Sequence, residues 1–266
     1  MQSVLVTGAT DGIGRATARE LLARGWHVLV HGRNEVKARN VARGLGSADA
    51  KATPVWGNFE KMSEVVGLSA QVKAEVSTLD VIVNNAGIYA DSRKFNSDGF
   101  EMTMAVNYLA PFLLTHHLLS NLTGAPSARI VNVSSMTHSG ASLDLDDLRF
   151  ERSWSSYAAY STSKLANILF TQRLAVHLKQ TRVTANALHP GVVGTKLLRQ
   201  GFGLVGESVE DGARCSVFLA TSPKVARVSG KYFVDCTEQK PSAKARDARL
   251  ALKLWDASLR LLEGYL

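Results

Sequence analysis

The chain has 266 residues, of which 45% are hydrophobic and 20% are charged, and this composition is typical of a folded globular protein rather than a disordered one. Its formal net charge of +8 would suit an anionic partner. The densest basic cluster, 240–253, mixes acidic and apolar residues with the basic ones, which favours a solvated helix face, so we expect no nucleic-acid partner.

The sequence contains no unbroken apolar stretch of the roughly 18 to 20 residues that a membrane helix needs. Residues 1–10 run directly into a strand pattern and leave no room for a signal sequence. Cys215 and Cys236 show neither metal-ligand spacing nor the pattern of a disulfide framework. We therefore expect a cytoplasmic protein with reduced thiols and no membrane anchor.

Short β-branched runs alternate along the chain with segments of helical period. The predicted strands lie at 3–8, 26–32, 52–57, 79–87, 128–135, 182–191 and 230–236. The predicted helices lie at 13–24, 35–45, 61–77, 100–121, 157–180, 208–220 and 245–265. This alternation predicts an α/β fold: one Rossmann-type, doubly wound domain over 1–266, with a seven-stranded parallel sheet covered by helices on both faces.

Three loops and the tail stand out from this pattern. The loops at 88–99, 136–156 and 192–206 follow strands, at the edge of the sheet where ligands bind in this fold, so we expect them to set substrate specificity. The helical tail, 242–266, places Leu250, Leu254, Ala257 and Leu261 on one face. We expect that face to dock on the body of the domain, with an oligomer contact as the second interpretation.

A glycine-rich turn follows the first predicted strand. Residues 6–14, "VTGATDGIG", place Gly8, Gly12 and Gly14 between that strand and the first helix. Glycine lets the backbone approach a pyrophosphate, and the helix N-terminus offers free N–H groups to the anion. The sequence therefore predicts a dinucleotide site here.

The end of the second predicted strand indicates which dinucleotide binds. NAD-binding proteins of this architecture usually place an acid there, whereas this chain has Gly32 and Arg33. A guanidinium can bind the 2′-phosphate of NADP through two parallel hydrogen bonds. We therefore predict that NADP(H) is preferred over NAD(H), with weak assistance from Lys37; the alternative is a solvent-exposed arginine.

Six motifs together resemble a known family. They are "TGATDGIG" (7–14), "NNAG" (84–87), "VNYLAPFLLT" (106–115), "VNVSS" (131–135), "YSTSK" (160–164) and "HPGVVGT" (189–195). In this order they resemble the short-chain dehydrogenase/reductases, and the chain looks most like the branch of retinol dehydrogenases and WW-domain oxidoreductases. The resemblance implies a catalytic tetrad of Asn107, Ser135, Tyr160 and Lys164, with Asn107 bending its helix and holding a water that leads to Lys164.

The same resemblance implies a set of cofactor-binding residues and an assembly. The cofactor residues are Gly8, Thr10, Asp11, Gly12, Ile13, Gly14, Arg33, Asn58, Phe59, Asn84, Ala86, Gly87, Tyr160, Lys164, Pro190, Val192 and Thr195. Asn58 stands where the family usually has an aspartate for the adenine amine, and its side-chain carbonyl can accept the same bond. A homodimer or homotetramer that pairs through the helices at 100–121 and 157–180 is also expected.

The residues themselves support the tyrosine chemistry. A carbonyl that accepts a hydride also needs a proton, and a tyrosine hydroxyl can supply it if a nearby cation lowers its pKa from about 10. Tyr160 and Lys164 are one helical turn apart. Tyr157 is about 10.5 Å from Lys164 along the helix axis, too far to pair with it. Ser135 ends a strand and can polarise a carbonyl, whereas Ser134 points to the other face.

The remaining candidates are weaker. Loop position suggests that the substrate side is lined by Met136, Trp154, Tyr157 and Phe202. Four histidines, His116, His117, His138 and His189, lack a second ligand or acid at useful spacing, so no metal is proposed. We expect an oxidoreductase that interconverts an alcohol and an aldehyde or ketone on an apolar small molecule. The alternative is an NADP(H)-binding regulatory or scaffold protein without turnover.

Overall fold

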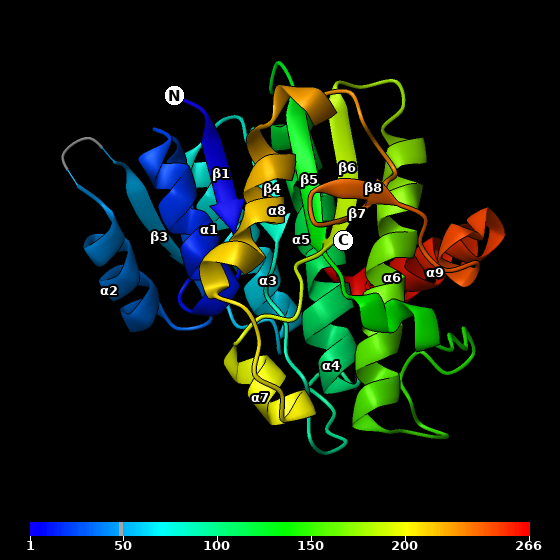
Figure 1. The fold of residues 1–266 in the computed structure, drawn as a ribbon. Helices are drawn as coiled ribbons and strands as arrows, with labels where there is room; N and C mark the ends of the chain where they lie inside the picture. Colours follow the sequence, from blue (N-terminus) through cyan, green and yellow to red (C-terminus); the bar gives the residue numbers. More distant parts are fainter. Residues whose placement is uncertain (48–49) are drawn as a thin grey trace.

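The computed structural model describes residues 1–47 and 50–266. One eight-stranded sheet with the order β3-β2-β1-β4-β5-β6-β7-β8 runs through its centre, flanked by helices (Figure 1). The strands are β1 (Ser3–Val6), β2 (His27–Gly32), β3 (Ala52–Trp56), β4 (Val81–Asn84), β5 (Ala128–Val133), β6 (Val183–His189), β7 (Tyr232–Val234) and β8 (Thr237–Gln239). The first seven are parallel, which confirms the predicted doubly wound α/β fold.

The eighth strand was not predicted. β8 pairs antiparallel with β7 through a two-residue turn, in which Asp235 has φ 48° and Cys236 has φ 59°. A type I′ hairpin needs positive φ at both central residues, and its usual sequence signal is Asn-Gly or Asp-Gly. The strand is also short and exposed, so it carries no pattern of buried residues. The predicted count of seven strands is therefore one too low.

Helices cover both faces of the sheet. They are α1 (Gly12–Ala23), α2 (Glu35–Leu45), α3 (Met62–Glu75), α4 (Met102–Met104), α5 (Ala110–Thr123), α6 (Ser156–His177), α7 (Lys196–Phe202), α8 (Val209–Thr221) and α9 (Ala248–Leu261). Leu5 and Ile82 pack into the cluster under α3, α5, α6 and α9, while Val4 and Val83 pack into the cluster under α1 and α8. Strands buried on both faces explain the nearly continuous hydrophobic runs in the sequence. No helix in the described ranges combines the length and hydrophobicity needed to cross a membrane.

The predicted helix at 100–121 is interrupted at Asn107. A π-helical segment, Ala105–Leu109, separates α4 from α5. Single-turn π segments inside helices occur frequently at functional sites. The predicted single helix is in fact three segments, and its irregular turn contains Asn107, while a bend there stays a prediction.

The C-terminal helix docks on the body of the molecule, as predicted. Leu254 and Ala257 of α9 are buried. Trp255 packs with its ring centroid 5.0 Å from that of Phe112 on α5 and 6.0 Å from that of Phe170 on α6. This tail therefore covers part of the two helices through which subunits were expected to pair.

Candidate active site

The candidate site lies where the strand order reverses between β1 and β4. In open parallel sheets, ligands bind in the crevice beyond the carboxyl ends of the strands at such a switch point. The segments that follow β1, β4, β5 and β6 all reach this edge, and they contain the glycine turn, the "NNAG" motif, Ser135 and the "HPGVVGT" motif.

The glycine turn is packed tightly against the end of β4. Gly8 has φ 65°, and a Cβ atom there would lie 3.0 Å from the Ala86 Cα. A Cβ atom on Gly14 would overlap the Asn85 side-chain amide. The Thr7 hydroxyl oxygen accepts hydrogen bonds from the backbone N–H groups of Asn85 and Ala86, at 2.9 and 3.0 Å. Larger residues at Gly8 and Gly14 would clash with the protein itself, so the turn needs glycine, and this glycine cradle before a helix N-terminus fits a pyrophosphate.

Thr7 and Asn85 were not among the predicted site residues. The Asn85 amide donates to the Thr7 carbonyl at 2.8 Å, so the two residues join the phosphate turn to the end of β4. The sequence signal was present, because both residues belong to the motifs "TGATDGIG" and "NNAG". Thr7 and Asn85 are 78 positions apart, so sequence spacing does not reveal that they are hydrogen-bonded to each other.

The segment after β6 folds over the same turn. Asp11 caps α1 and pairs with the Lys196 ammonium at 2.7 Å, which holds the pKa of the Asp11 carboxyl below its ordinary value. Thr195 caps α7, and its methyl carbon lies 3.5 Å from where a Cβ of Gly12 would stand. The region 192–206, which was expected to be a loop, thus contains the short helix α7. This helix has no buried residue, so the sequence carries no hydrophobic pattern that would predict it.

Four further cofactor residues implied by the resemblance lie in the segments after β1 and β6. Ile13 packs near Gly212 of α8, and the Thr10 methyl lies 2.6 Å from where a Cβ of Gly32 would stand. Pro190 is partly exposed, and Val192 is 39% exposed. Their contact with a cofactor stays a prediction.

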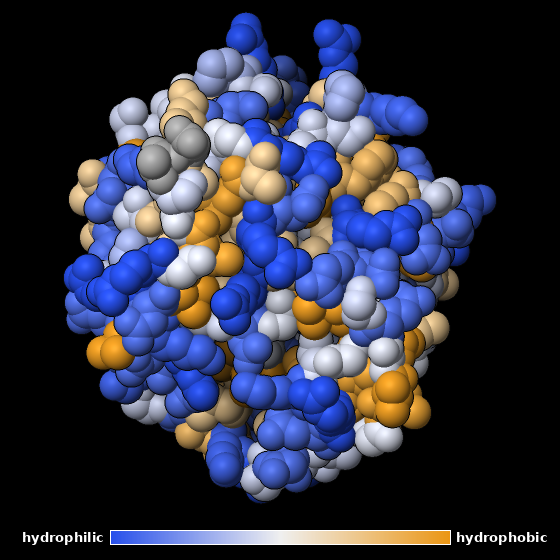
Figure 2. Space-filling model, turned by 60° about the vertical axis from the view of Figure 1, so that its left-hand side comes forward, coloured by the Kyte–Doolittle hydropathy of each residue, from blue (hydrophilic) through white to orange (hydrophobic). Residues whose placement is uncertain are grey.

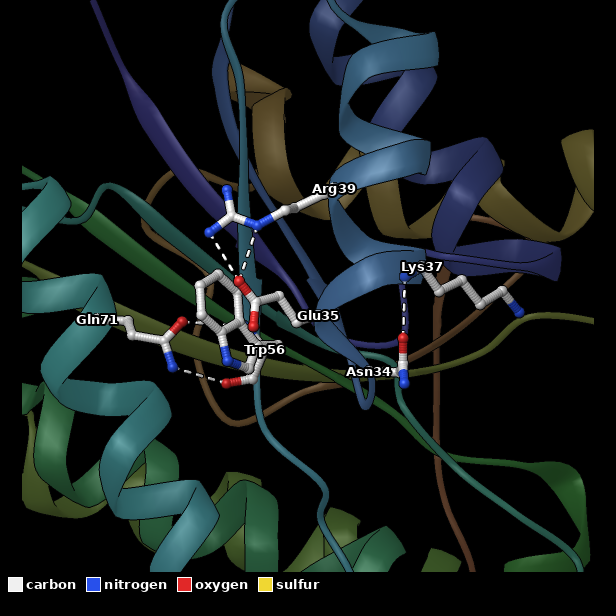
Figure 3. A network of polar contacts seen from close by, with 6 residues as sticks. All are labelled: Asn34, Glu35, Lys37, Arg39, Trp56 and Gln71. Carbon is white, nitrogen blue, oxygen red and sulfur yellow. Dashed lines mark hydrogen bonds and ion pairs between the residues drawn. The ribbon is translucent and has the colours of Figure 1, made fainter.

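The exposed cations at the start of α2 mark the far end of the crevice. Arg33 and Lys37 are exposed, and within the described residues neither pairs with a carboxylate. Arg39 is engaged elsewhere: it pairs with Glu35 at 2.8 Å and lies 4.9 Å over the Trp56 ring (Figure 3). The face shown in Figure 2 carries hydrophilic areas with hydrophobic ones between them. Arg33 and Lys37 are therefore the two cations here that are free to meet a phosphate.

The two cofactor residues expected after β3 are only partly open to a ligand. Asn58 is half-buried, and its side-chain carbonyl accepts a hydrogen bond from the Glu60 N–H at 3.2 Å. A carbonyl oxygen has two lone pairs, so a second bond to adenine stays possible. Phe59, by contrast, is buried, and its ring stacks on His31 with centroids 4.7 Å apart. Phe59 therefore packs against His31 in the interior and is not open to a ligand.

Asn84 departs most from the expectation. It was placed beside the cofactor, but its side chain is buried, and its amide donates to the Thr115 hydroxyl at 3.1 Å and to the Asn132 carbonyl at 2.8 Å. The side chain of a strand residue points to one face of the sheet, and that of Asn84 points to the face covered by α5. Asn84 therefore stabilises the interior through its hydrogen bonds, while Ala86 and Gly87 lie at the crevice.

The structure brings Ser135, Tyr160 and Lys164 together. Tyr160 and Lys164 are buried on α6, and the Lys164 ammonium donates to the Val133 carbonyl at 3.1 Å. Burial raises the pKa of Tyr160 to about 12, against a smaller opposing effect from its hydrogen bond with Ser135. Burial also lowers the pKa of Lys164 to about 8. The expected lowering of the tyrosine pKa by lysine is not seen here, because burial removes hydration from the charged form of each group.

Ser135 also has a structural role. Its hydroxyl accepts a hydrogen bond from the Thr137 N–H at 3.3 Å and so caps the short 3-10 helix at 136–140. The Ser134 hydroxyl also contacts α6, where it donates to the Lys164 backbone carbonyl at 2.7 Å. The two adjacent hydroxyls therefore have different partners on the same helix.

Asn107 anchors the chain next to this group. Its amide accepts from the Ile88 N–H at 2.8 Å, and it donates to the Ile88 carbonyl at 3.0 Å and to the Ser163 hydroxyl at 3.1 Å. A Cβ atom on Gly87 would lie 3.3 Å from the Asn107 oxygen and 3.6 Å from the Lys164 nitrogen. The end of "NNAG" is therefore held against both residues.

An aromatic cluster covers Tyr160. The ring of Tyr89 lies 5.3 Å from that of Tyr160 and 5.1 Å from that of Phe202, and Phe202 lies 5.9 Å from Tyr160. A Cβ atom on Gly201 would lie 2.8 Å from the Tyr89 ring. Phe202 was predicted to line the substrate side. Tyr89 was not, since only its position in the loop at 88–99 pointed to it.

The other predicted substrate residues separate into two kinds. Met136 is 55% exposed and Tyr157 is 46% exposed, with its hydroxyl beside Gly140. Trp154 instead packs against the core and donates from its indole to the buried Glu101 carboxylate at 3.1 Å. The prediction that Trp154 lines the pocket is not supported by this placement, because its polar end is fixed in the interior.

The histidines noted in the sequence do not form a metal site. Across residues 1–47 and 50–266, no group of three or more His, Cys, Asp and Glu side chains is arranged to hold a metal ion. His138 bonds to the Ser135 carbonyl at 2.7 Å and accepts from the Ser242 N–H at 3.1 Å. Cys215 and Cys236 are free thiols.

A separate surface groove of about 850 Å³ lies between α1 and α8 and contains none of the predicted site residues. Its charges are neutralised within the groove, because Arg19 pairs with Glu210 at 2.7 Å and Arg24 pairs with Glu20 at 2.8 Å. We therefore place the candidate site at the switch point, where the glycine cradle and the buried tyrosine lie.

A parallel sheet with a glycine cradle at its switch point defines a dinucleotide-binding α/β protein. Residues 2–202 match the short chain dehydrogenase family, and the chain belongs to that family. Retinol dehydrogenase 14 of Homo sapiens is 40% identical, over 97% of this chain and 85% of the relative. Retinol dehydrogenase 12 of Bos taurus is 38% identical, over 97% and 85%.

Solved structures agree with this assignment. An uncharacterised protein from Mycobacterium paratuberculosis superposes with a TM-score of 0.84 at 31% identity, covering 99% of this chain and 94% of that chain. A short chain dehydrogenase from Escherichia coli CFT073, complexed with NADPH, superposes with a TM-score of 0.73 at 25% identity, covering 89% and 97%. The protein is accordingly an NAD(P)-dependent oxidoreductase that acts on CH–OH groups.

Proposed function

We propose that the protein is an NADP(H)-dependent enzyme that interconverts an alcohol and an aldehyde or ketone on an apolar small molecule, with Tyr160 as general acid and base. The convergence of Ser135 and Lys164 on one buried tyrosine carries this proposal. A structural tyrosine would not need a hydroxyl and a buried ammonium beside it, because burying each polar group costs free energy unless it is compensated.

Each residue has a role that its position supports. Bound NADPH supplies the hydride. Tyr160 then gives its proton to the forming alkoxide, or removes one in the reverse direction, and the Ser135 hydroxyl donates a hydrogen bond to the substrate oxygen. The Lys164 ammonium lies 5.4 Å from the Tyr160 ring centroid, and a unit charge about 5 Å away stabilises a tyrosinate by about 3 kcal/mol at an effective dielectric of about 20. Asn107 holds the Ile88 backbone, and through it the floor of the site.

The preference for NADP(H) rests on the free cations at the start of α2. Arg33 and Lys37 are exposed and have no carboxylate partner among the described residues, whereas Arg39 is held by Glu35. No acid stands where an NAD-specific site would have one, since the residues after β2 are Arg33 and Asn34. A 2′-phosphate would gain charge-assisted hydrogen bonds there.

The aromatic cluster supports an apolar substrate. Tyr89 and Phe202 present ring carbon beside Tyr160, and Met136 is exposed at the rim. The names of the relatives suggest apolar alcohols such as retinol as members of a test panel.

Because α9 covers Phe112 and Phe170, we propose that any homo-oligomer pairs through a surface other than that part of α5 and α6.

The direct test is consumption of NADPH by the purified protein with a panel of apolar aldehydes and ketones. We expect turnover with at least one class, and faster turnover with NADPH than with NADH. Binding of NADPH without turnover on any carbonyl or alcohol would contradict the proposal and support a regulatory role instead. Absence of NADPH binding would contradict both.

A further inference from the structure

His31 joins three strand ends underneath the glycine turn. It is the fifth residue of β2 and is fully buried. Its Nδ1 lies 3.1 Å from the Gly8 N–H, and its Nε2 lies 2.9 Å from the Gly57 carbonyl oxygen. Its own carbonyl accepts from the Ala9 N–H at 2.8 Å. One residue of β2 therefore binds two consecutive amides of the turn after β1 and the chain just after β3.

The partners fix the protonation state of the ring. The Gly8 amide can only donate, so Nδ1 must carry a lone pair; the Gly57 carbonyl can only accept, so Nε2 must carry the proton. His31 is therefore neutral and held in a single tautomer. The ring also stacks on Phe59 with an interplanar angle of 20°, which fixes its orientation.

The bond to Gly8 matters because of what Gly8 does. Gly8 turns the chain with φ 65°, directly where the backbone must approach a pyrophosphate. Its N–H lies beyond the last residue pair of β1 and β2, Val6 with Val30, so the sheet does not bind it. Without the His31 ring, this donor would be left without its partner under the turn, and the turn could adopt other orientations.

We propose that His31 is a positioning residue that holds the Gly8 turn in the orientation that binds NADP(H), and that it sets cofactor affinity rather than the rate of the chemical step. This inference rests on the proposed function, because it assumes that NADP(H) binds at the glycine turn. His31 is not among the groups around Tyr160, whose ring contacts are Tyr89, Phe202 and Lys164.

Two near-isosteric variants separate the two bonds. In His31→Asn, the amide oxygen can take the place of Nδ1 and accept from Gly8. In His31→Gln, the amide nitrogen can take the place of Nε2 and donate to Gly57, leaving Gly8 unpaired. We expect the Kd for NADPH, measured by calorimetry, to rise at least about tenfold in His31→Gln and to stay within about threefold of wild type in His31→Asn. At saturating NADPH, kcat should be unchanged within about threefold in both variants.

His27 provides a matched control. It lies on the same strand, is also buried, and bonds to the Thr53 hydroxyl at 2.8 Å without touching the turn. His27→Gln should leave the Kd for NADPH unchanged. Equal Kd values for wild type and both His31 variants, or a fall in kcat with an unchanged Kd, would overturn the inference. If wild type itself does not bind NADPH, the proposed function fails instead.

A measurement on the unmodified protein keeps the test valid if His31→Gln does not fold. Nitrogen-15 spectra of histidine-labelled protein should show His31 with an unprotonated Nδ1 and a protonated Nε2, identified by the signal that is missing in His31→Asn. Addition of NADPH should shift these two signals, because the His31 ring is hydrogen-bonded to the Gly8 amide, which belongs to the turn that binds the cofactor. The opposite tautomer, or signals that do not respond to saturating NADPH, would overturn the inference.

Discussion

The Lys164 ammonium lies 5.4 Å from the centroid of the Tyr160 ring, and both side chains are buried on α6. Burial raises the pKa of the Tyr160 hydroxyl to about 12 and lowers the pKa of the Lys164 ammonium to about 8. Below about pH 8 the lysine is therefore mainly charged and can stabilise the tyrosinate. This pairing with Tyr160 gives a reason for the Lys164 side chain of α6 to be buried in the protein interior.

Replacement of Lys164 by methionine should lower kcat about 100-fold, because the tyrosinate loses a nearby positive charge worth about 3 kcal/mol. The pH at which alcohol oxidation reaches half its maximum should also move upward, since Tyr160 becomes harder to ionise. Steady-state rates across pH would show both effects. Lys253→Met, at an exposed position on α9, is the matched control and should change neither quantity.

Replacement of Arg33 by aspartate should weaken NADPH binding about 10- to 100-fold and leave NADH binding the same or stronger, because a carboxylate repels the 2′-phosphate. The ratio of the two Kd values measures this. Arg39→Gln should leave the ratio unchanged, since Arg39 is held by Glu35 and Trp56. An unaltered ratio in Arg33→Asp would show that Arg33 is only a surface residue.

Acid should destabilise the protein partly through His31. Burial lowers its folded-state pKa to about 4, from an ordinary value of 6.5, so the unfolded chain binds the proton more readily. Stability from this group is complete above pH 6.5 and is lost as the pH falls to about 4, by about 3 kcal/mol in total. Urea unfolding at several pH values should show a shallower acid loss in His31→Asn than in wild type. Equal losses would count against this pKa.

Replacement of Trp255 by alanine should reduce the free energy of unfolding by about 3 to 5 kcal/mol, because a buried indole leaves a cavity between α5, α6 and α9. Urea denaturation at constant pH measures the change. Leu252→Ala, on the exposed face of the same helix, should change it by no more than about 0.5 kcal/mol. A similar small change in Trp255→Ala would mean that the tail is loosely docked.

The sequence was most informative where a physical pattern is local. Buried parallel strands are continuous hydrophobic runs, and the glycine turn must follow the first of them, so the seven parallel strands and the cradle of Gly8, Gly12 and Gly14 were predictable. Tyr160 and Lys164 were predictable because helix geometry places residues one turn apart side by side.

What the sequence did not reveal depends on contacts between distant segments. His31 is a polar residue inside a hydrophobic strand, and its role appears only when Gly8 and Gly57 are beside it. Asn84 belongs to a recognised motif, yet its side chain faces Asn132 in the interior. Tyr89 reaches Tyr160 through a loop whose course no periodic pattern describes.

The central claim is that Tyr160 transfers the proton, and the Tyr160→Phe variant tests it most directly. The substitution removes one hydroxyl from a buried ring, so the fold and the cofactor site should persist. We predict that NADPH binding measured by calorimetry stays within about threefold of wild type, while turnover of an accepted carbonyl falls at least about 100-fold. Tyr157→Phe should keep most of the turnover. Wild-type rates in Tyr160→Phe, with NADPH bound, would contradict the account.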